Sequence, residues 1–186
     1  MPNDRGADHL TPATMLPALA LPATDGSDVD LAALPGRSVV IVYPWTGRPG
    51  HHNPPDWNLI PGAHGSTPEL EGFRHRHADF MRLGVRLFGL SRQTTEYQYE
   101  LVARLALPFP ILSDEEGRFA AALRLPSFTT GGEIYLKRLT LVIKDGRIET
   151  VFYPVADAAG HANEVLQWIA AHTSPQRGEV GRNAAG

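Results

Sequence analysis

SVVIVY, residues 38–43, is a short run dominated by β-branched apolar residues. Such a run predicts a strand that lies buried within a sheet. A second run of this kind, VRLFGL, occupies residues 85–90. Between the two, apolar residues recur at helical spacing from Ser66 to Leu83, and Gly84 stands where a helix would end. The order strand, helix, strand indicates a sheet covered by helices.

The same alternation continues on either side of this unit. Upstream, a hairpin is expected from Ala18–Leu21 and Val29–Leu31 around the turn Asp25-Gly26. Downstream, the pattern predicts in order a helix that opens at Thr94 or Thr95, a strand at Phe109–Leu112, a helix at Glu115–Leu123, a hairpin of Tyr135–Ile143 and Arg147–Tyr153 around Asp145-Gly146, and a last helix at His161–His172. The closing antiparallel hairpin makes the sheet mixed. The predicted fold class is therefore α/β, with a central mixed sheet, helices on both of its faces and an N-terminal hairpin extension.

Composition excludes several classes of protein. The 186 residues are 42% apolar and 20% charged, which is ordinary for one globular domain. The formal net charge of −3, without a basic block, points to neither nucleic acid nor an anionic membrane as a partner. Prolines interrupt the first apolar stretch, so it does not resemble a signal peptide, and we predict a cytoplasmic protein with no membrane span. The chain has no cysteine, so it can form neither a disulfide nor a thiolate.

Three segments are expected along the chain. Residues 1–15 are polar and aperiodic, which predicts a flexible leader, and residues 174–186 lack an apolar cluster, which predicts a disordered tail. The domain is expected to span residues 16–173. Within it, residues 44–65 are rich in proline and glycine and form a loop of a length typical of lids and binding loops. This loop precedes the helix that starts at Ser66, at an edge where α/β sheets place ligands.

Five segments, in this order, resemble motifs of the peroxiredoxins. They are Tyr43–Pro49 (YPWTGRP), Ile60–Pro68 (IPGAHGSTP), Phe73-Arg74, Phe109–Asp114 (FPILSD) and Lys137–Ile143 (KRLTLVI). Over residues 16–172 the chain resembles the branch of redoxin or alkyl hydroperoxide reductase/thiol-specific antioxidant type. The resemblance implies a thioredoxin-like fold, thiol-dependent reduction of peroxides as the reaction, and no cofactor.

The resemblance also implies which positions form the site. The family carries Gly-Cys-Thr-Pro where this chain has Gly65 to Pro68, and that cysteine attacks the O–O bond of the peroxide. The implied positions are Ser66 for the reactive cysteine, Arg138 for the activating arginine, Glu71 for a second, resolving cysteine, and Pro44, Trp45, Arg48, Thr67 and Pro68 for the pocket. A helix N-terminus and an arginine would lower the pKa of a cysteine there. A thioredoxin-type reductant would be a partner only if a cysteine were present, and a homodimer is a further expectation from the family.

Ser66 and Glu71 depart from the family at both cysteine positions. Oxygen cannot follow the oxidation steps of sulfur, and a serine hydroxyl is a poor nucleophile without an adjacent base. Two hypotheses follow. The chain is a peroxiredoxin by descent with little or no activity, or it is a non-catalytic redoxin-fold protein that binds a peroxide, a small oxyanion or a regulatory partner.

Simpler explanations exist for the same residues. Ser66-Thr67-Pro68-Glu69 matches a capping box, so Ser66 could serve mainly as a helix cap, while a hydrolase role lacks the glycine that follows such a nucleophile. Arg138 either forms a salt bridge, to Glu69 or Asp114, or binds an anion or peroxide. Trp45 and Arg48 could simply anchor the loop. No metal site is expected, because His75 and His77 face different directions on a helix and the loop histidines have no carboxylate at ligand spacing.

Overall fold

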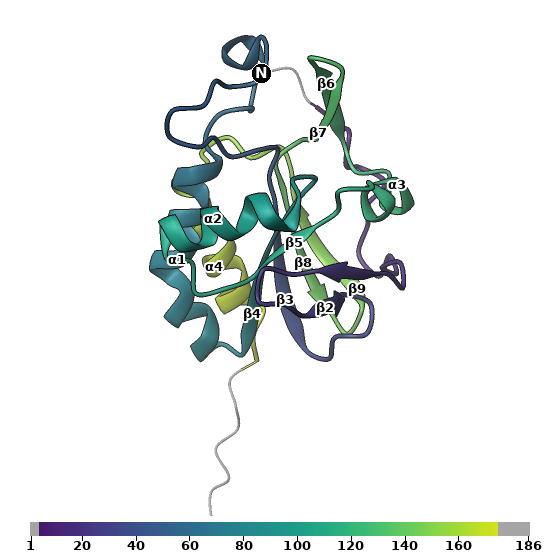
Figure 1. Ribbon diagram of the computed structural model, residues 1–186. Coiled ribbons are helices and arrows are strands. Elements are labelled where there is room, and N and C mark those ends of the chain that lie inside the picture. The colour runs from purple at the N-terminus through teal and green to yellow at the C-terminus, as the bar shows by residue number, and fades with distance from the viewer. Residues whose placement is uncertain (1–3, 175–186) are drawn as a thin grey trace, which may run out of the picture.

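The computed structural model describes residues 4–174, and at its centre lies a five-stranded sheet in the order β5-β4-β3-β8-β9 (Figure 1). The strands are β3 (Arg37–Val42), β4 (Val85–Ser91), β5 (Ile111–Ser113), β8 (Leu139–Lys144) and β9 (Arg147–Phe152). β3, β4 and β5 run parallel, whereas β8 is antiparallel to β3 and β9 to β8. The predicted mixed sheet is confirmed, and its central strand is the SVVIVY run that is buried on both faces.

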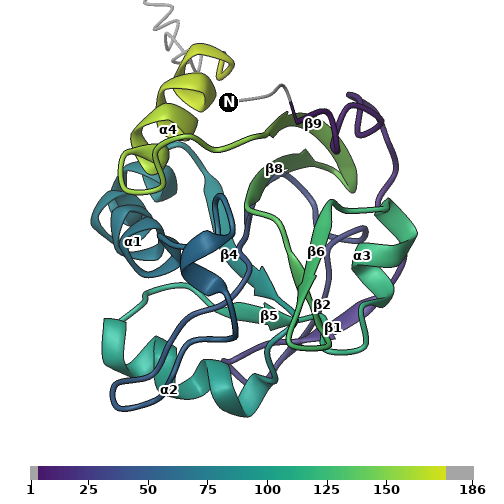
Figure 2. The same cartoon turned by 90° about the horizontal axis from the view of Figure 1, so that it is seen from above.

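Helices cover both faces of this sheet, as predicted. One face packs against α1 (Ser66–Arg82), α2 (Thr95–Leu105) and α4 (His161–Ala171), and the core between them includes Phe73, Phe80 and Leu101. The other face packs against α3 (Arg118–Leu123) and a hairpin of β1 (Ala20–Pro22) and β2 (Asp28–Asp30). Figure 2 shows α1 beside α4 and, across the sheet, α3.

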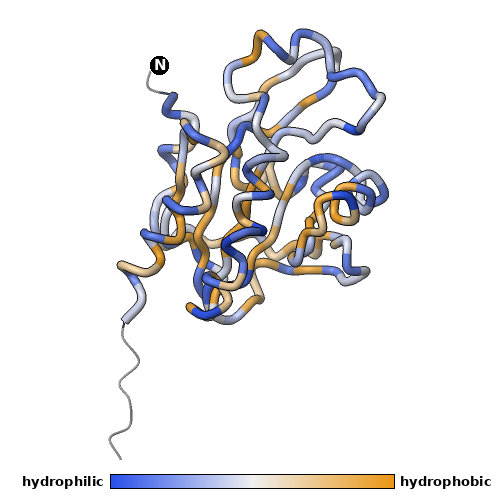
Figure 3. The backbone as a smooth tube through the Cα atoms, turned by 90° about the vertical axis from the view of Figure 1, so that its left-hand side faces the viewer, coloured by the Kyte–Doolittle hydropathy of each residue, from blue (hydrophilic) through white to orange (hydrophobic). Residues whose placement is uncertain are grey.

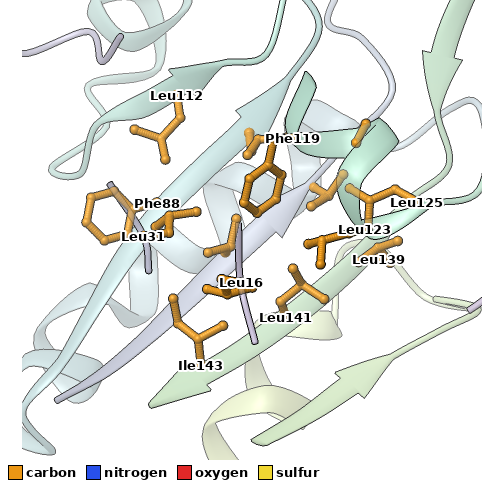
Figure 4. Close-up of a cluster of buried hydrophobic side chains, with 14 of the residues drawn as sticks. Leu16, Leu31, Phe88, Leu112, Phe119, Leu123, Leu125, Leu139, Leu141 and Ile143 are labelled. Atoms are coloured by element: carbon orange, nitrogen blue, oxygen red, sulfur yellow. The ribbon is translucent and has the colours of Figure 1, made fainter. Parts of the chain in front are cut away.

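Successive side chains of each strand point to opposite faces of the sheet, so this second face has its own core. Leu16, Leu31, Phe88, Phe119, Leu141 and Ile143 lie in it, together with further leucines (Figure 4). Hydrophobic segments therefore concentrate along the sheet, while the outer loops are mostly hydrophilic (Figure 3). Within residues 4–174, none of the helices has both the length and the apolar character that crossing a bilayer requires.

The N-terminal hairpin and the helix ends follow the local signals. β1 and β2 pair antiparallel around Asp25-Gly26, with Gly26 at φ 84°. Gly84, at φ 70°, follows α1 where the helix was expected to stop. Thr94 caps α2 by accepting a hydrogen bond from the backbone N–H of Tyr97. These predictions are confirmed.

The predicted strand Tyr135–Ile143 is wrong, because it is divided between two sheets. Its first residues belong to β7 (Glu133–Leu136), which pairs with β6 (Ser127–Thr130) in a separate hairpin that the sequence analysis missed. The signal was the pair Gly131-Gly132, whose φ angles of 57° and 82° form the turn. The strand is interrupted at Lys137 and Arg138, and β8 begins at Leu139.

Helix α3 is shorter than the predicted helix Glu115–Leu123. It begins at Arg118, because buried Asp114 accepts hydrogen bonds from the backbone N–H groups of Phe119 (3.0 Å) and Ala120 (2.9 Å). A carboxylate in this place supplies acceptors for the first turn of a helix. The residues that precede Arg118 form a turn instead of helix.

Residues 4–15 also differ from the predicted flexible leader. Ala7 and Leu10 are buried in the core, and Asp4 accepts hydrogen bonds from Lys137 Nζ (2.8 Å) and Tyr153 Oη (2.6 Å). Two small apolar side chains in a polar stretch give no periodic signal, which is why this packing was not predicted. Of the predicted disordered tail, residues 175–186 lie outside the described residues.

Candidate ligand site at the first turn of helix α1

Ser66 is the first residue of α1 and is buried. Gly65 precedes it as the N-cap, at φ 110°, a conformation that glycine adopts without strain. Neither Gly65 nor the following turn shows a side-chain cap, and the first helical bond joins the backbone N–H of Glu69 to the carbonyl of Gly65 (3.0 Å). The predicted capping box at Ser66 and Glu69 is therefore wrong.

Arg138 explains why the capping box does not form. It lies in the interruption between β7 and β8 and reaches both side chains: Nη2 donates to Ser66 Oγ at 3.1 Å, and Nη1 donates to Glu69 Oε2. Nη2 also donates to the carbonyl oxygen of His64 at 3.1 Å. A guanidinium contact therefore replaces the local cap. Of the two predicted salt-bridge partners of Arg138, Glu69 is confirmed, whereas Asp114 caps α3.

The Arg138–Glu69 pair is almost fully buried, with side-chain exposures of 4% and 0%. Burial raises the pKa of the Glu69 carboxyl to about 7, and the neighbouring Arg138 opposes this increase. Glu69 Oε1 has no hydrogen-bond partner among the described residues, so only one of its oxygens is compensated when the group is ionised. The site thus holds a buried cation and a carboxyl group that resists ionisation.

A cavity of about 210 Å³ opens at Ser66. Thr67, Pro68 and Trp45 line it, as predicted for the pocket, together with Thr46, Asn53, Trp57 and His64 among others. Because Ser66 Oγ accepts a hydrogen bond from Arg138, its own hydrogen can donate into this cavity. Backbone N–H groups of the first turn of a long helix add positive potential at the same place.

Three predicted site residues lie elsewhere. Pro44 lines a separate hollow of about 450 Å³, which shares only Trp45 with the Ser66 cavity. Arg48 stacks on the ring of Tyr97, 3.9 Å from its centroid, and donates to the Tyr97 carbonyl, so it anchors the loop to α2. Glu71 is partly exposed on α1 and does not line the cavity. The length of loop 44–65 separates Pro44 from Ser66.

Aromatic side chains near the Ser66 cavity were not predicted as a group. Trp57, in the short 3₁₀ helix η1 (Trp57–Leu59), packs edge-on against Trp45 and Tyr135, with centroid distances of 5.4 and 5.1 Å. Phe128 lies 5.7 Å from Trp57 and stacks on Tyr135. The cluster joins loop 44–65 to the β6–β7 hairpin. Because the sequence did not predict this hairpin, it did not predict the cluster.

These contacts limit the chemistry of Ser66. In the described chain no carboxylate or imidazole is hydrogen-bonded to its hydroxyl, and His64, which lines the cavity, bonds to Asn58 Oδ1 (2.7 Å) instead. Ser66 therefore lacks the base that a hydrolytic nucleophile needs. Residues 4–174 contain no cluster of three or more histidine or acidic side chains that could hold a metal ion. What the site offers is hydrogen-bond donors and positive potential.

Comparisons with known proteins agree on one family. The family model described as Redoxin matches residues 11–166. A peroxiredoxin relative from Mycobacterium tuberculosis is 31% identical over 161 residues, covering 82% of this chain and 90% of the relative. Peroxiredoxin Bcp of Escherichia coli is 27% identical over 163 residues, covering 84% of this chain and 93% of the relative.

Solved structures show the same fold. The crystal structure of peroxidoxin BcpB from Mycobacterium tuberculosis superposes with a TM-score of 0.73 at 23% identity, covering 89% of this chain and all of that one. A cysteine-to-serine variant of Xanthomonas campestris peroxiredoxin Q gives 0.71 at 25% identity, covering 88% of this chain and all of that one. The thioredoxin-like fold of peroxiredoxin type, predicted from the motifs, is confirmed.

Proposed function

The chain belongs to the redoxin family of peroxiredoxins, and from this membership we propose that it binds a peroxide or a small oxyanion at Ser66 without reducing it. Peroxide reduction in this family is carried out by a cysteine, which passes through a sulfenic acid. This chain has no cysteine at any position, and an alcohol has no corresponding oxidation step. A loss of peroxidase activity together with a retained pocket accounts for both facts.

The proposal rests on one contact. At the N-terminus of α1, Arg138 Nη2 donates a hydrogen bond to Ser66 Oγ at 3.1 Å. It leaves a polarised O–H group that can donate to a ligand oxygen in the adjacent cavity. A hydroperoxide oxygen and the oxygen of a small anion both accept such a bond. The cavity volume of about 210 Å³ suits a small ligand.

The first test concerns turnover. We expect consumption of hydrogen peroxide by the purified protein, with dithiothreitol or thioredoxin as reductant, to equal that of the buffer. Consumption well above the buffer rate, in protein shown to be free of contaminating peroxidase by mass spectrometry, would contradict the proposal.

The second test concerns binding. Nitrate is a small oxyanion that stays singly charged from pH 5 to pH 9, and Trp45 and Trp57 line the cavity as fluorescent reporters. We expect saturable nitrate binding at pH 6 that Ser66→Ala weakens, because the variant removes the donor. The matched control is Ser127→Ala, since Ser127 is exposed on β6 outside the cavity. Absence of saturation, or equal binding by Ser66→Ala, would remove support for the site.

The second hypothesis, a peroxiredoxin by descent that has lost its activity and binds nothing, is supported by the geometry around Ser66. If a thiol stood there, the helix N-terminus and Arg138 would stabilise its thiolate. A reductant, a homodimer and a cytoplasmic location belong to this proposal as predictions from the sequence and family.

A further inference from the structure

Among its acceptors Arg138 has two side chains: the Ser66 hydroxyl at the cavity and the Glu69 carboxylate behind it. We propose that binding of an oxyanion at Ser66 is coupled to the uptake of one proton by Glu69, so that the site binds anions tightly only when this carboxyl is neutral. The inference rests on the proposed function and adds the regulation of the same site.

The buried position of the pair is the reason for the coupling. When Glu69 is ionised it cancels the charge of Arg138, and an anion arriving at Ser66 meets no net positive charge and a second negative charge nearby. Burial keeps water from screening this repulsion. When Glu69 is neutral, the charge of Arg138 is available to the ligand. One anion and one proton therefore enter the site together.

Glu69 is suited to hold that proton. Its Oε2 accepts from Arg138, whereas its Oε1 is buried and has no partner among the described residues. A proton on Oε1 removes the larger cost of a buried negative charge and leaves the contact of Oε2 with Arg138 in place. The raised pKa of Glu69, at about 7, places the change within the physiological range.

Other titratable groups lie near the pair or line the cavity. His161 of α4 hydrogen-bonds with Thr140 Oγ1 (2.9 Å) and Glu164 (2.9 Å), and burial lowers the pKa of its ring, which disfavours the charged imidazolium. The Asp157 carboxylate, in the loop before α4, has the opposite effect and raises the pKa of His161. His64 lines the cavity and is exposed, so any charge on its ring must be separated from that of Glu69 by experiment.

The linkage between proton binding at Glu69 and anion binding at Ser66 determines how strongly the apparent Kd depends on pH. If the anion binds only the protonated form, the apparent Kd rises as 1 + 10^(pH − 7), which is about 30-fold between pH 5.5 and pH 8.5. The slope approaches tenfold per pH unit at the alkaline end. Residual binding to the ionised form would flatten the curve at the alkaline end, while the lower bend of the curve, at the pKa of the free protein, would stay in place.

The experiment measures the nitrate Kd by tryptophan fluorescence from pH 5.5 to pH 8.5, in full-length protein and in three variants. We expect Glu69→Gln, a neutral isostere, to bind nitrate with a nearly constant Kd. His64→Gln is expected to keep the pH slope of the wild type. Glu71→Gln, two residues further along α1 and outside the cavity lining, is expected to keep it too.

Each result decides between the two proposals. A wild-type Kd that does not change with pH, or a slope that is lost in His64→Gln, overturns the coupling but leaves the anion site. No nitrate binding at any pH overturns the anion site, and the coupling with it. If Glu69→Gln does not fold, proton uptake on nitrate binding is measured in the wild type instead, by calorimetry at pH 7.5 in two buffers of different ionisation enthalpy. Uptake of about 0.8 proton, which is the fraction of Glu69 ionised at pH 7.5, supports the coupling, and zero uptake contradicts it.

Discussion

The substitution Ser66→Cys should restore the first chemical step of the family. It exchanges one oxygen for sulfur at the N-terminus of α1, where Arg138 Nη2 lies 3.1 Å from the present Oγ. A thiolate there would attack a hydroperoxide: a new S–O bond forms, the O–O bond breaks, and the leaving oxygen takes a proton to become an alcohol or water. Because Glu71 occupies the second cysteine position, only an external thiol could reduce the sulfenic acid.

The thiolate stabilisation follows from the contacts at this position. The end of a helix contributes up to about 1–2 kcal/mol in a partly buried place, and a charge-assisted hydrogen bond about 1.5–3 kcal/mol. Burial of Ser66 and the nearby Glu69 carboxyl oppose these contributions. A net gain of about 2.7 kcal/mol would raise the thiolate population about 100-fold at acidic pH. Since nucleophilicity falls as a thiol becomes more acidic, the rate gain is about tenfold.

Alkylation by iodoacetamide at pH 6 measures this gain directly. The chain has no other cysteine, so every modified molecule reports on the introduced thiol. The matched control is Ser127→Cys, at an exposed position on β6. We expect Ser66→Cys to react about tenfold faster, and after hydrogen peroxide to gain the mass of one oxygen. A folded Ser66→Cys protein that reacts no faster than the control and gains no oxygen would refute the assigned roles of Arg138 and the helix end.

Three further predictions concern stability, measured by urea unfolding. The pKa of Glu69 is raised from 4.5 to about 7, so between these pH values the folded state binds a proton that the unfolded state has released. The free energy of unfolding should therefore fall by up to about 3 kcal/mol as the pH rises from 4.5 through 7. Glu69→Gln should remove this dependence on pH. Asp114→Ala removes both acceptors for the first turn of α3 and should cost about 2 kcal/mol, and a loss below about 0.5 kcal/mol would contradict the cap. Gly146→Ala should lower the free energy of unfolding by about 1–3 kcal/mol more than Gly36→Ala does. Both residues have φ 75°, but only at Gly146 would the new Cβ collide with the carbonyl of Ala32. Equal losses of stability in the two variants would exclude the collision.

Elements with a complete local signal were predictable from the sequence. The strands β3 and β4, the helix α1 with its stop at Gly84 and the β1–β2 hairpin depend on periodicity and on turn residues that lie within them. Failures occurred where a side chain from outside the element competes with its local pattern. Asp114 shortened α3 from outside the helix, and the apolar run before Ile143 was divided because Arg138 turns towards α1.

The site shows the same competition most clearly. Ser66 and Glu69 match the capping-box pattern, yet both side chains bind Arg138, which is 72 residues away from Ser66 in the chain. No local rule contains that contact, whereas the family motifs brought Ser66 and Arg138 together correctly. The motifs did not account for loop 44–65, whose length places Pro44 at another hollow and leaves the aromatic cluster around Trp57 unforeseen.

The presence of Arg138 in a chain without cysteine needs no catalytic explanation. Arg138 is buried and donates to Glu69 and to the carbonyl oxygens of Gly62 and His64, so its removal would leave buried acceptors without a donor, at a cost of about 1–3 kcal/mol each. Arg138 and Glu69 therefore stabilise one another, and Arg138 would be costly to replace even if the site bound nothing. The Ser66 hydroxyl is different, because Arg138 has other acceptors in the carbonyl oxygens of His64 and Gly62. A function for the site therefore has to be sought in experiments that change Ser66 or the proton on Glu69, since removal of Arg138 would confound binding with folding.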